Sequence, residues 1–211
     1  ILIESFSALF IEYNFLNSFI FTVTAIYSIM IISYFLMKFG YNIMVKMINA
    51  LPGLKSLFLI GQYFIPFFLI LLFSQWFGES ILGELLFILI IVMGNLKSRF
   101  AKELDSVKEH YLIAAKSLGA DENKISKEVL FKLVQPGLFS SFQHSHKLLW
   151  LYVLVYEFIC ETGGIGSIIS TAIDYNDLSL IVILIVILTL TFILFDYLLL
   201  NLKKKYFYWS S

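Results

Sequence analysis

The stretch YLIAAKSLGADENKISKEVLFKLVQPGLFSS, residues 111–141, is a long polar segment in a chain that otherwise consists largely of Phe, Ile and Leu. Hydrophobic residues make up 60% of the 211 residues and charged residues only 14%. A water-soluble domain of this length needs far fewer apolar residues for its core. The chain is therefore predicted to be an integral membrane protein, with this segment as a connection outside the bilayer.

Apolar stretches on both sides of the segment are candidates for helices that cross the hydrocarbon core, which takes about 20 residues each. They are predicted at residues 18–37, 57–77, 81–96, 138–160 and 178–200. The third is short and requires tilt or burial within a bundle. Strict alternation of polar and apolar residues is rare, which argues against a membrane barrel. The predicted fold is an all-α polytopic transmembrane helix bundle, one domain over residues 1–211, with residues 97–137 as its polar loop.

Fourteen of the fifteen cations lie in three connections, which predicts the orientation of the chain; the fifteenth, Lys147, is expected near the cytoplasmic end of the span 138–160. They occur between the first and second spans, in the polar loop and after the last span, whereas the other connections hold none. The positive-inside rule places these three connections, and the C-terminus, in the cytoplasm. An odd number of spans leaves Ile1 outside, so we expect a further span before it, which would give six in the complete subunit.

Two short helices are predicted within the polar loop. Residues 111–118 are good helix formers, and Gly119 is suited to end a helix. A second helix is predicted to begin near Asp121, with an apolar side, and to stop at Pro136 and Gly137. Such a pair is either a solvated loop or a surface for a partner, and composition alone leaves both open.

Several polar residues and glycines lie in or beside the predicted spans. An intramembrane carboxylate such as Glu157 is costly unless it faces a cavity or a partner, so it is a candidate for a translocation path or gate, with structural hydrogen bonding as the alternative. The same two interpretations apply to Asn95 and Ser74. Gly164 and Gly166 form either a tight turn or a flexible outer element near the path.

Other kinds of site are not indicated by the sequence. It contains no Gly-x-x-x-x-Gly-Lys-Ser/Thr motif for nucleotide, and its single cysteine, Cys160, permits no intrachain disulfide. His144 and His146 diverge around a helix axis, so a shared metal ion is not expected. The formal net charge is zero, which gives no indication of nucleic acid as a partner. We expect the chain to bind no cofactor of its own.

The polar loop resembles a known motif. The run Ile113-Ala114-Ala115-Lys116-Ser117-Leu118-Gly119-Ala120 is similar to the E-A-A-x-x-x-G-A cytoplasmic loop of the inner-membrane permeases of binding-protein-dependent ABC importers. Without a gap, Val129 falls at an aliphatic position of that family, and Pro136-Gly137-Leu138 matches its P-G-I/L. The sequence departs from the family at Ile113, which replaces Glu, and at Lys132, which replaces Pro.

Further motifs resemble one subfamily, the nitrate/sulfonate/taurine type. Glu157 followed by Gly164-Ile165-Gly166 is similar to its E-x-x-x-x-x-x-G-L-G. Upstream, Pro66, Trp76-Phe77-Gly78 and Asn95 match its P…W-F-G…N run. Asp196 and Trp209 match its last span and its C-terminal tryptophan. Together with the loop motif, the resemblance covers nearly the whole chain.

This resemblance implies an importer permease in a bacterial cytoplasmic membrane. Its polar loop would be the coupling loop that docks on ATPase subunits, of which two are expected and which carry ATP and Mg²⁺. Further partners would be a second permease subunit, an external substrate-binding protein and the lipid bilayer. The alternatives are a structural subunit of another membrane complex and an intramembrane enzyme. The residues expected at the ATPase contact are Ile113, Ala114, Ala115, Gly119, Ala120, Val129, Pro136 and Gly137.

The sequence indicates only the chemical class of the substrate. The subfamily suggests a small anion or a vitamin-like heterocycle. The near absence of cations in the predicted spans favours a neutral or zwitterionic solute instead. Both interpretations remain open at the level of sequence.

Overall fold

The computed structural model describes residues 2–50 and 66–207, except 107, 108, 120, 122–124, 126–128 and 130. These residues form helices and connecting turns, and no strand occurs among them, which confirms the predicted all-α fold. A helix at Pro66–Phe77 lies between α2 and α4 in the chain. The labelled elements are α1 (Leu2–Ile11), α2 (Phe15–Ala50), α4 (Ile81–Ser106), α5 (Glu109–Ser117), α7 (Phe131–Cys160), α8 (Ile165–Asp174) and α9 (Leu178–Tyr206).

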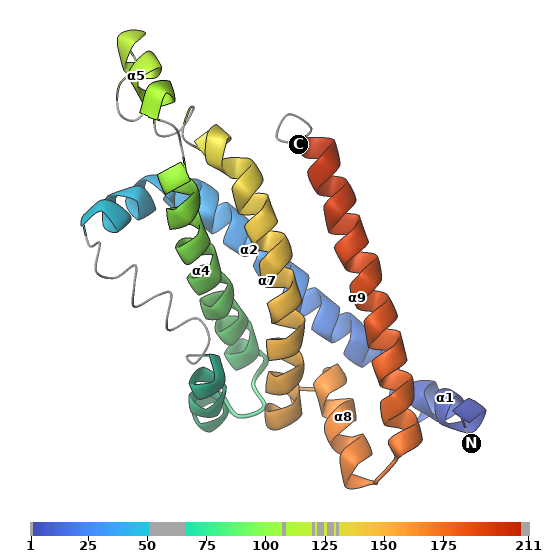
Figure 1. The fold of residues 1–211 in the computed structure, drawn as a ribbon. Coiled ribbons are helices and arrows are strands. Elements are labelled where there is room, and N and C mark those ends of the chain that lie inside the picture. The colour runs from blue at the N-terminus through green and yellow to red at the C-terminus, as the bar shows by residue number, and fades with distance from the viewer. Residues whose placement is uncertain are drawn as a thin grey trace.

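Helix α7 is the centre of the bundle. It packs against α2, α4, α8 and α9, and α2 also contacts α4 (Figure 1). The short helices lie at the two ends: α5 projects beyond the bundle at the end where the C-terminus lies, and α1 and α8 lie at the opposite end (Figure 1). The bundle therefore has an α5 end and an α8 end.

Among the residues that the structure describes, two helices are long and apolar enough to cross a membrane, or three if the bent pair α7 and α8 counts as one span. The two are residues Phe15–Gly40 of α2 and all of α9, and the axes of α7 and α8 differ by 52°. Helices α2, α7 and α9 contain three of the five predicted spans. The span predicted at 57–77 lies partly outside the described residues, which show only the shorter helix Pro66–Phe77. The span predicted at 81–96 is the first part of α4, where Asn95 and Lys97 end the apolar run.

Helices extend into the predicted polar loop from both ends. Helix α4 continues to Ser106, and α7 already begins at Phe131, so both helices extend into residues 97–137. Pro136 and Gly137 do not stop a helix but lie inside α7. Pro136 is the sixth residue of α7, so the helix lacks the backbone hydrogen bond that its N–H would have donated to the carbonyl of Lys132. The hydroxyls of Ser140 and Ser141 donate to the carbonyls of Pro136 and Gly137, at 3.1 and 2.9 Å.

Candidate functional site

Helix α5 carries exposed apolar side chains outside the bundle. Ile113 is 58% exposed and Leu118, directly after the helix, is 88% exposed. Ala114 is exposed and Ala115 half-buried. Exposed apolar side chains beside small residues form a surface that a second protein can cover closely.

The predicted helix end at Gly119 is confirmed. The residue has φ +76°, and its N–H donates to the carbonyl of Lys116 at 2.9 Å, which closes the last turn. This left-handed conformation is easy for glycine and costs other residues about 1 kcal/mol or more. A Cβ at Gly119 would meet no other atom of the chain within 4 Å.

The residues predicted to contact the ATPase come from separate elements of the structure, and their contact with a partner stays a prediction. Ile113, Ala114, Ala115 and Gly119 belong to α5 and its end, whereas Val129 is half-buried before α7. Ala120, like Trp209, lies outside the described residues. Pro136 and Gly137 lie within α7, where a Cβ on Gly137 would overlap the carboxyl of Glu103 on α4. The glycine therefore permits close approach of α4 and α7 at the α5 end.

At the α8 end, Glu157 is fully buried and hydrogen-bonded to two other helices. Its Oε1 accepts from the hydroxyl of Thr22 on α2 at 2.6 Å, and its Oε2 accepts from the N–H of Gly166 on α8 at 2.9 Å. The Thr22 hydroxyl oxygen in turn accepts from the N–H of Ile165 at 3.0 Å. These bonds give Glu157 the structural role that the sequence left as an alternative; its role in a path or gate stays a prediction.

A second carboxyl, which the sequence analysis missed, lies beside Glu157. Glu84 in the first turn of α4 is also fully buried, and its Oε2 accepts from the hydroxyl of Thr162 at 2.7 Å. Its carboxyl lies close enough to that of Glu157 for the two groups to interact. The sequence did contain a feature that could have identified it, because Glu84 is the charged residue within the predicted span 81–96. We call Thr22, Glu84, Glu157 and Thr162 the carboxyl cluster.

Two of the predicted glycines complete the carboxyl cluster. A Cβ on Gly164 would overlap the carboxyl of Glu157, and a Cβ on Gly166 would overlap the carbonyl oxygen of Leu154. Both glycines are buried, and neither has a positive φ. They therefore allow the close approach of α8 to α7, and their role as a flexible element near the path stays a prediction.

Asn95 and Ser74 lie away from this cluster. Asn95 is buried in α4, about 16 Å along the helix from Glu84 at 1.5 Å per residue. The Ser74 hydroxyl donates to the carbonyl of Leu71 within its own helix at 2.8 Å. The structure thus brings together Glu157, Gly164 and Gly166, but not all five predicted path residues.

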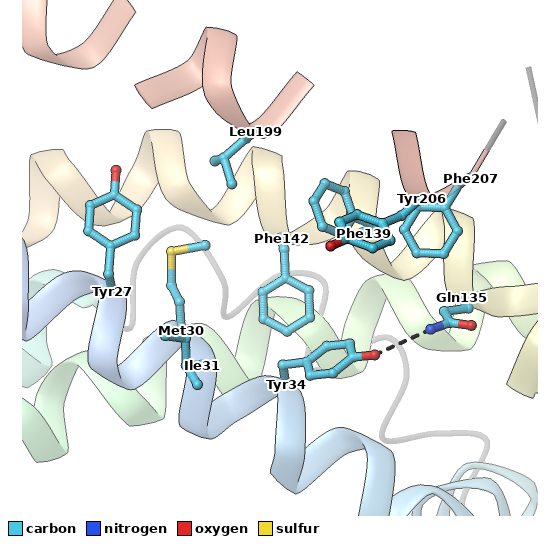
Figure 2. Close-up of a pocket in the computed structure, with 10 residues that line it drawn as sticks. All are labelled: Tyr27, Met30, Ile31, Tyr34, Gln135, Phe139, Phe142, Leu199, Tyr206 and Phe207. Atoms are coloured by element: carbon cyan, nitrogen blue, oxygen red, sulfur yellow. Dashed lines mark hydrogen bonds between the residues drawn. The ribbon is translucent and has the colours of Figure 1, made fainter. Parts of the chain in front are cut away.

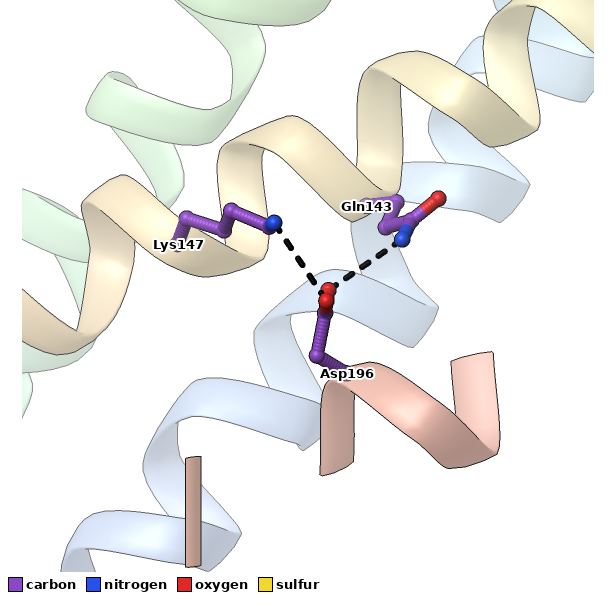
Figure 3. Close-up of polar contacts among 3 residues, drawn as sticks. All are labelled: Gln143, Lys147 and Asp196. Atoms are coloured by element: carbon purple, nitrogen blue, oxygen red, sulfur yellow. Dashed lines mark hydrogen bonds and ion pairs between the residues drawn. The ribbon is translucent and has the colours of Figure 1, made fainter. Parts of the chain in front are cut away.

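Helix α9 is joined to α7 by a polar contact within the bundle (Figure 3). Asp196 accepts from Nε2 of Gln143 at 3.1 Å and pairs with Nζ of Lys147 at 3.3 Å. The partner cation is thus on α7, not in the lysine run that follows Asp196 on α9. His144 is exposed and His146 is buried, so the two histidines diverge as predicted.

A cavity of about 520 Å³ lies between α2, α7 and α9 (Figure 2). Aromatic and aliphatic side chains form most of its lining, and its polar contact is a hydrogen bond from Gln135 to the hydroxyl of Tyr34 at 3.2 Å. None of the predicted path residues lines it. Such a lining suits a largely apolar group, and no charged side chain of the described residues lies in it.

Comparison with known proteins identifies the family. Residues 11–207 match the family described as binding-protein-dependent transport system inner membrane component. Neither the curated proteins nor the solved structures gave a match. The family match spans well over half of the chain and agrees with its apolar helical bundle, so the chain belongs to the inner-membrane permease components of binding-protein-dependent transport systems.

Proposed function

We propose that this chain is the permease subunit of an ATP-driven importer of the nitrate/sulfonate/taurine type in a bacterial cytoplasmic membrane. An external binding protein delivers a small solute, which crosses between this chain and a second permease subunit. Two ATPase subunits on the cytoplasmic side bind ATP and Mg²⁺ and drive the alternation of access. The chain itself carries out no chemical reaction.

The exposed surface of α5 is the observation that carries this proposal. The helix projects beyond the bundle (Figure 1) and presents Ile113, Ala114 and Leu118 to the outside. Apolar side chains in such a position are stabilised when a partner covers them. The family motif falls on this same helix, and the ATPase is the partner that a transport permease requires there.

Co-purification with the ATPase tests the proposal directly. The permease, its ATPase and the binding protein are reconstituted in vesicles, and ATP hydrolysis is measured with and without binding protein and candidate solutes. An importer shows hydrolysis that the loaded binding protein stimulates. A structural subunit of another complex, or an intramembrane enzyme, shows no such stimulation, and that result would reject the proposal.

The orientation predicts the labelling of introduced cysteines. A cysteine at Ser117 on α5 is expected to react with an impermeant thiol reagent only from the cytoplasmic side, and one at Tyr175 only from the outside. Both positions are exposed, and the native Cys160 is buried, so the unmodified chain serves as an unlabelled control. The opposite pattern would reverse the orientation.

A role of Glu157 in the path or gate predicts a transport defect. Glu157→Gln is expected to lower solute uptake at least tenfold while co-purification with the ATPase stays normal, because the residue lies at the end of the bundle opposite α5 (Figure 1). Glu161→Gln, an exposed carboxyl four residues later, is the matched control and should transport normally. Normal uptake by Glu157→Gln would leave the residue with its hydrogen-bonding role alone.

A further inference from the structure

The two carboxyl groups of the carboxyl cluster lie together without a compensating cation. Glu84 and Glu157 are each 0% exposed, and among the described residues neither has a Lys, Arg or His partner. The donors that reach them are the hydroxyls of Thr22 and Thr162 and the N–H of Gly166. Two adjacent carboxylates in so buried a site repel each other strongly, so the site favours a form with a smaller charge.

The hydrogen bonds indicate what reduces that charge. An ionised carboxylate can only accept hydrogen bonds, so a proton on one of the two carboxyls removes one of the buried like charges and supplies a donor between them. Both oxygens of Glu157 already accept from Thr22 and Gly166, whereas Oε1 of Glu84 is buried and has no other donor within the described part of the chain. Protonation of Glu84 at Oε1 therefore leaves every hydrogen bond from the protein to the two carboxyls in place.

The neighbouring groups supply no alternative charge. Helix α2 contributes the Thr22 hydroxyl and α8 its backbone, while the turn after α7 contributes Thr162. The other titratable side chains beside Glu84 are Tyr156 and Cys160 on α7, which are neutral around pH 7 in their ordinary state. Glu161 is exposed and bonded to Ser170 instead.

We propose that Glu84 and Glu157 form a proton-binding site that holds one shared proton, and that this proton links α4 to α7. In the protonated pair, one O–H of Glu84 donates to Glu157, and one negative charge remains, stabilised by Thr22 and Gly166. Release of the proton to solution leaves two like charges in contact. The α8 end then loses its link between α4 and α7, so the bundle becomes less stable as the pH rises.

Thermal unfolding of the whole chain in detergent, at a series of pH values from about 5 to about 9, tests this site. The folded pair holds one proton more than two ionised glutamates of the unfolded chain. The unfolding equilibrium constant is therefore expected to rise about tenfold per pH unit while that proton stays bound. Glu84→Gln supplies a permanent N–H donor and is expected to lose this slope. Glu161→Gln, the control, is expected to keep the wild-type slope.

Two results would overturn the proposal. One is an equal slope in the wild type and Glu84→Gln. The other is a rise of the wild-type midpoint with Na⁺, K⁺ or Ca²⁺ at constant pH and ionic strength, absent in Glu84→Gln, which would show that the pair holds a cation. If Glu84→Gln does not fold, infrared spectroscopy of the wild type decides: a protonated carboxyl band at neutral pH that disappears on alkaline titration is expected, and its absence would contradict the shared proton.

Discussion

Replacement of Gly119 by aspartate is expected to abolish the stimulation of ATP hydrolysis by the binding protein, while the permease stays folded in the membrane. The left-handed conformation of Gly119 costs aspartate about 1 kcal/mol, and the new charge enters a surface that we expect the ATPase to cover. Ala115→Asp, one helical turn earlier, is expected to act in the same way. Both positions lie outside the packed bundle, so the helices that cross the membrane keep their contacts.

Gly119→Asn is the matched control for the added charge. Asparagine has nearly the shape of aspartate and tolerates the left-handed conformation of Gly119, but it brings no charge into the surface. It should leave most of the stimulated hydrolysis intact. The measurements are pull-down of the ATPase and its activity in reconstituted vesicles. Normal coupling in both Gly119→Asp and Ala115→Asp would mean that α5 is only a solvated segment.

Gly166→Ala is expected to destabilise the bundle by about 1–3 kcal/mol or more, although it adds a single methyl group. The added Cβ would overlap the carbonyl oxygen of Leu154 and would lie 2.6 Å from the backbone nitrogen of Phe158. These are backbone atoms of α7, so no side-chain rotation can relieve the overlap. Helix α8 must move away from α7, and the hydrogen bond from Gly166 to Glu157 is lost with it.

Gly94→Ala is the control for Gly166→Ala. Gly94 lies inside α4, and a Cβ there meets nothing within 4 Å outside its own helix. This change is expected to be neutral or to stabilise by up to about 1 kcal/mol, because alanine favours a helix more than glycine does. Thermal unfolding in detergent compares the two variants. Equal midpoints would show that α8 does not pack against α7 as described.

The sequence was sufficient to predict the helical class. A chain this apolar lies in the bilayer, where backbone groups must hydrogen-bond to each other, and helices satisfy that requirement within one segment. It was also sufficient for the end of α5, since Gly119 meets a local requirement for a left-handed residue. The short helices α1 and α8 were missed because neither is long enough to cross a bilayer. Pro136 was misread because its effect depends on where the helix starts, and Phe131 gives no local signal for that start.

The carboxyl cluster shows a different limit of sequence reasoning. Glu157 was recognised because it is the acidic residue of the predicted span 138–160, but its neighbours Thr22 and Glu84 come from distant parts of the chain. No spacing in the sequence indicates that a hydroxyl in one span and a carboxyl in another lie close together. Their association depends on how α2, α4 and α7 cross, and only the tertiary structure supplies that.

The close packing of α4 and α7 has a consequence for how movement could pass through the membrane. The two helices touch where Gly137 meets Glu103 and again where Glu84 meets Glu157, and neither contains a proline between these points. Helix α7 has 30 residues and is thus about 45 Å long. A sideways displacement of about 3 Å at its first turn would tilt a rod of that length by about 4°. With contacts at both ends, the pair tilts as one rigid body, so a push at the α5 end changes the angle at which the opposite end meets its neighbours.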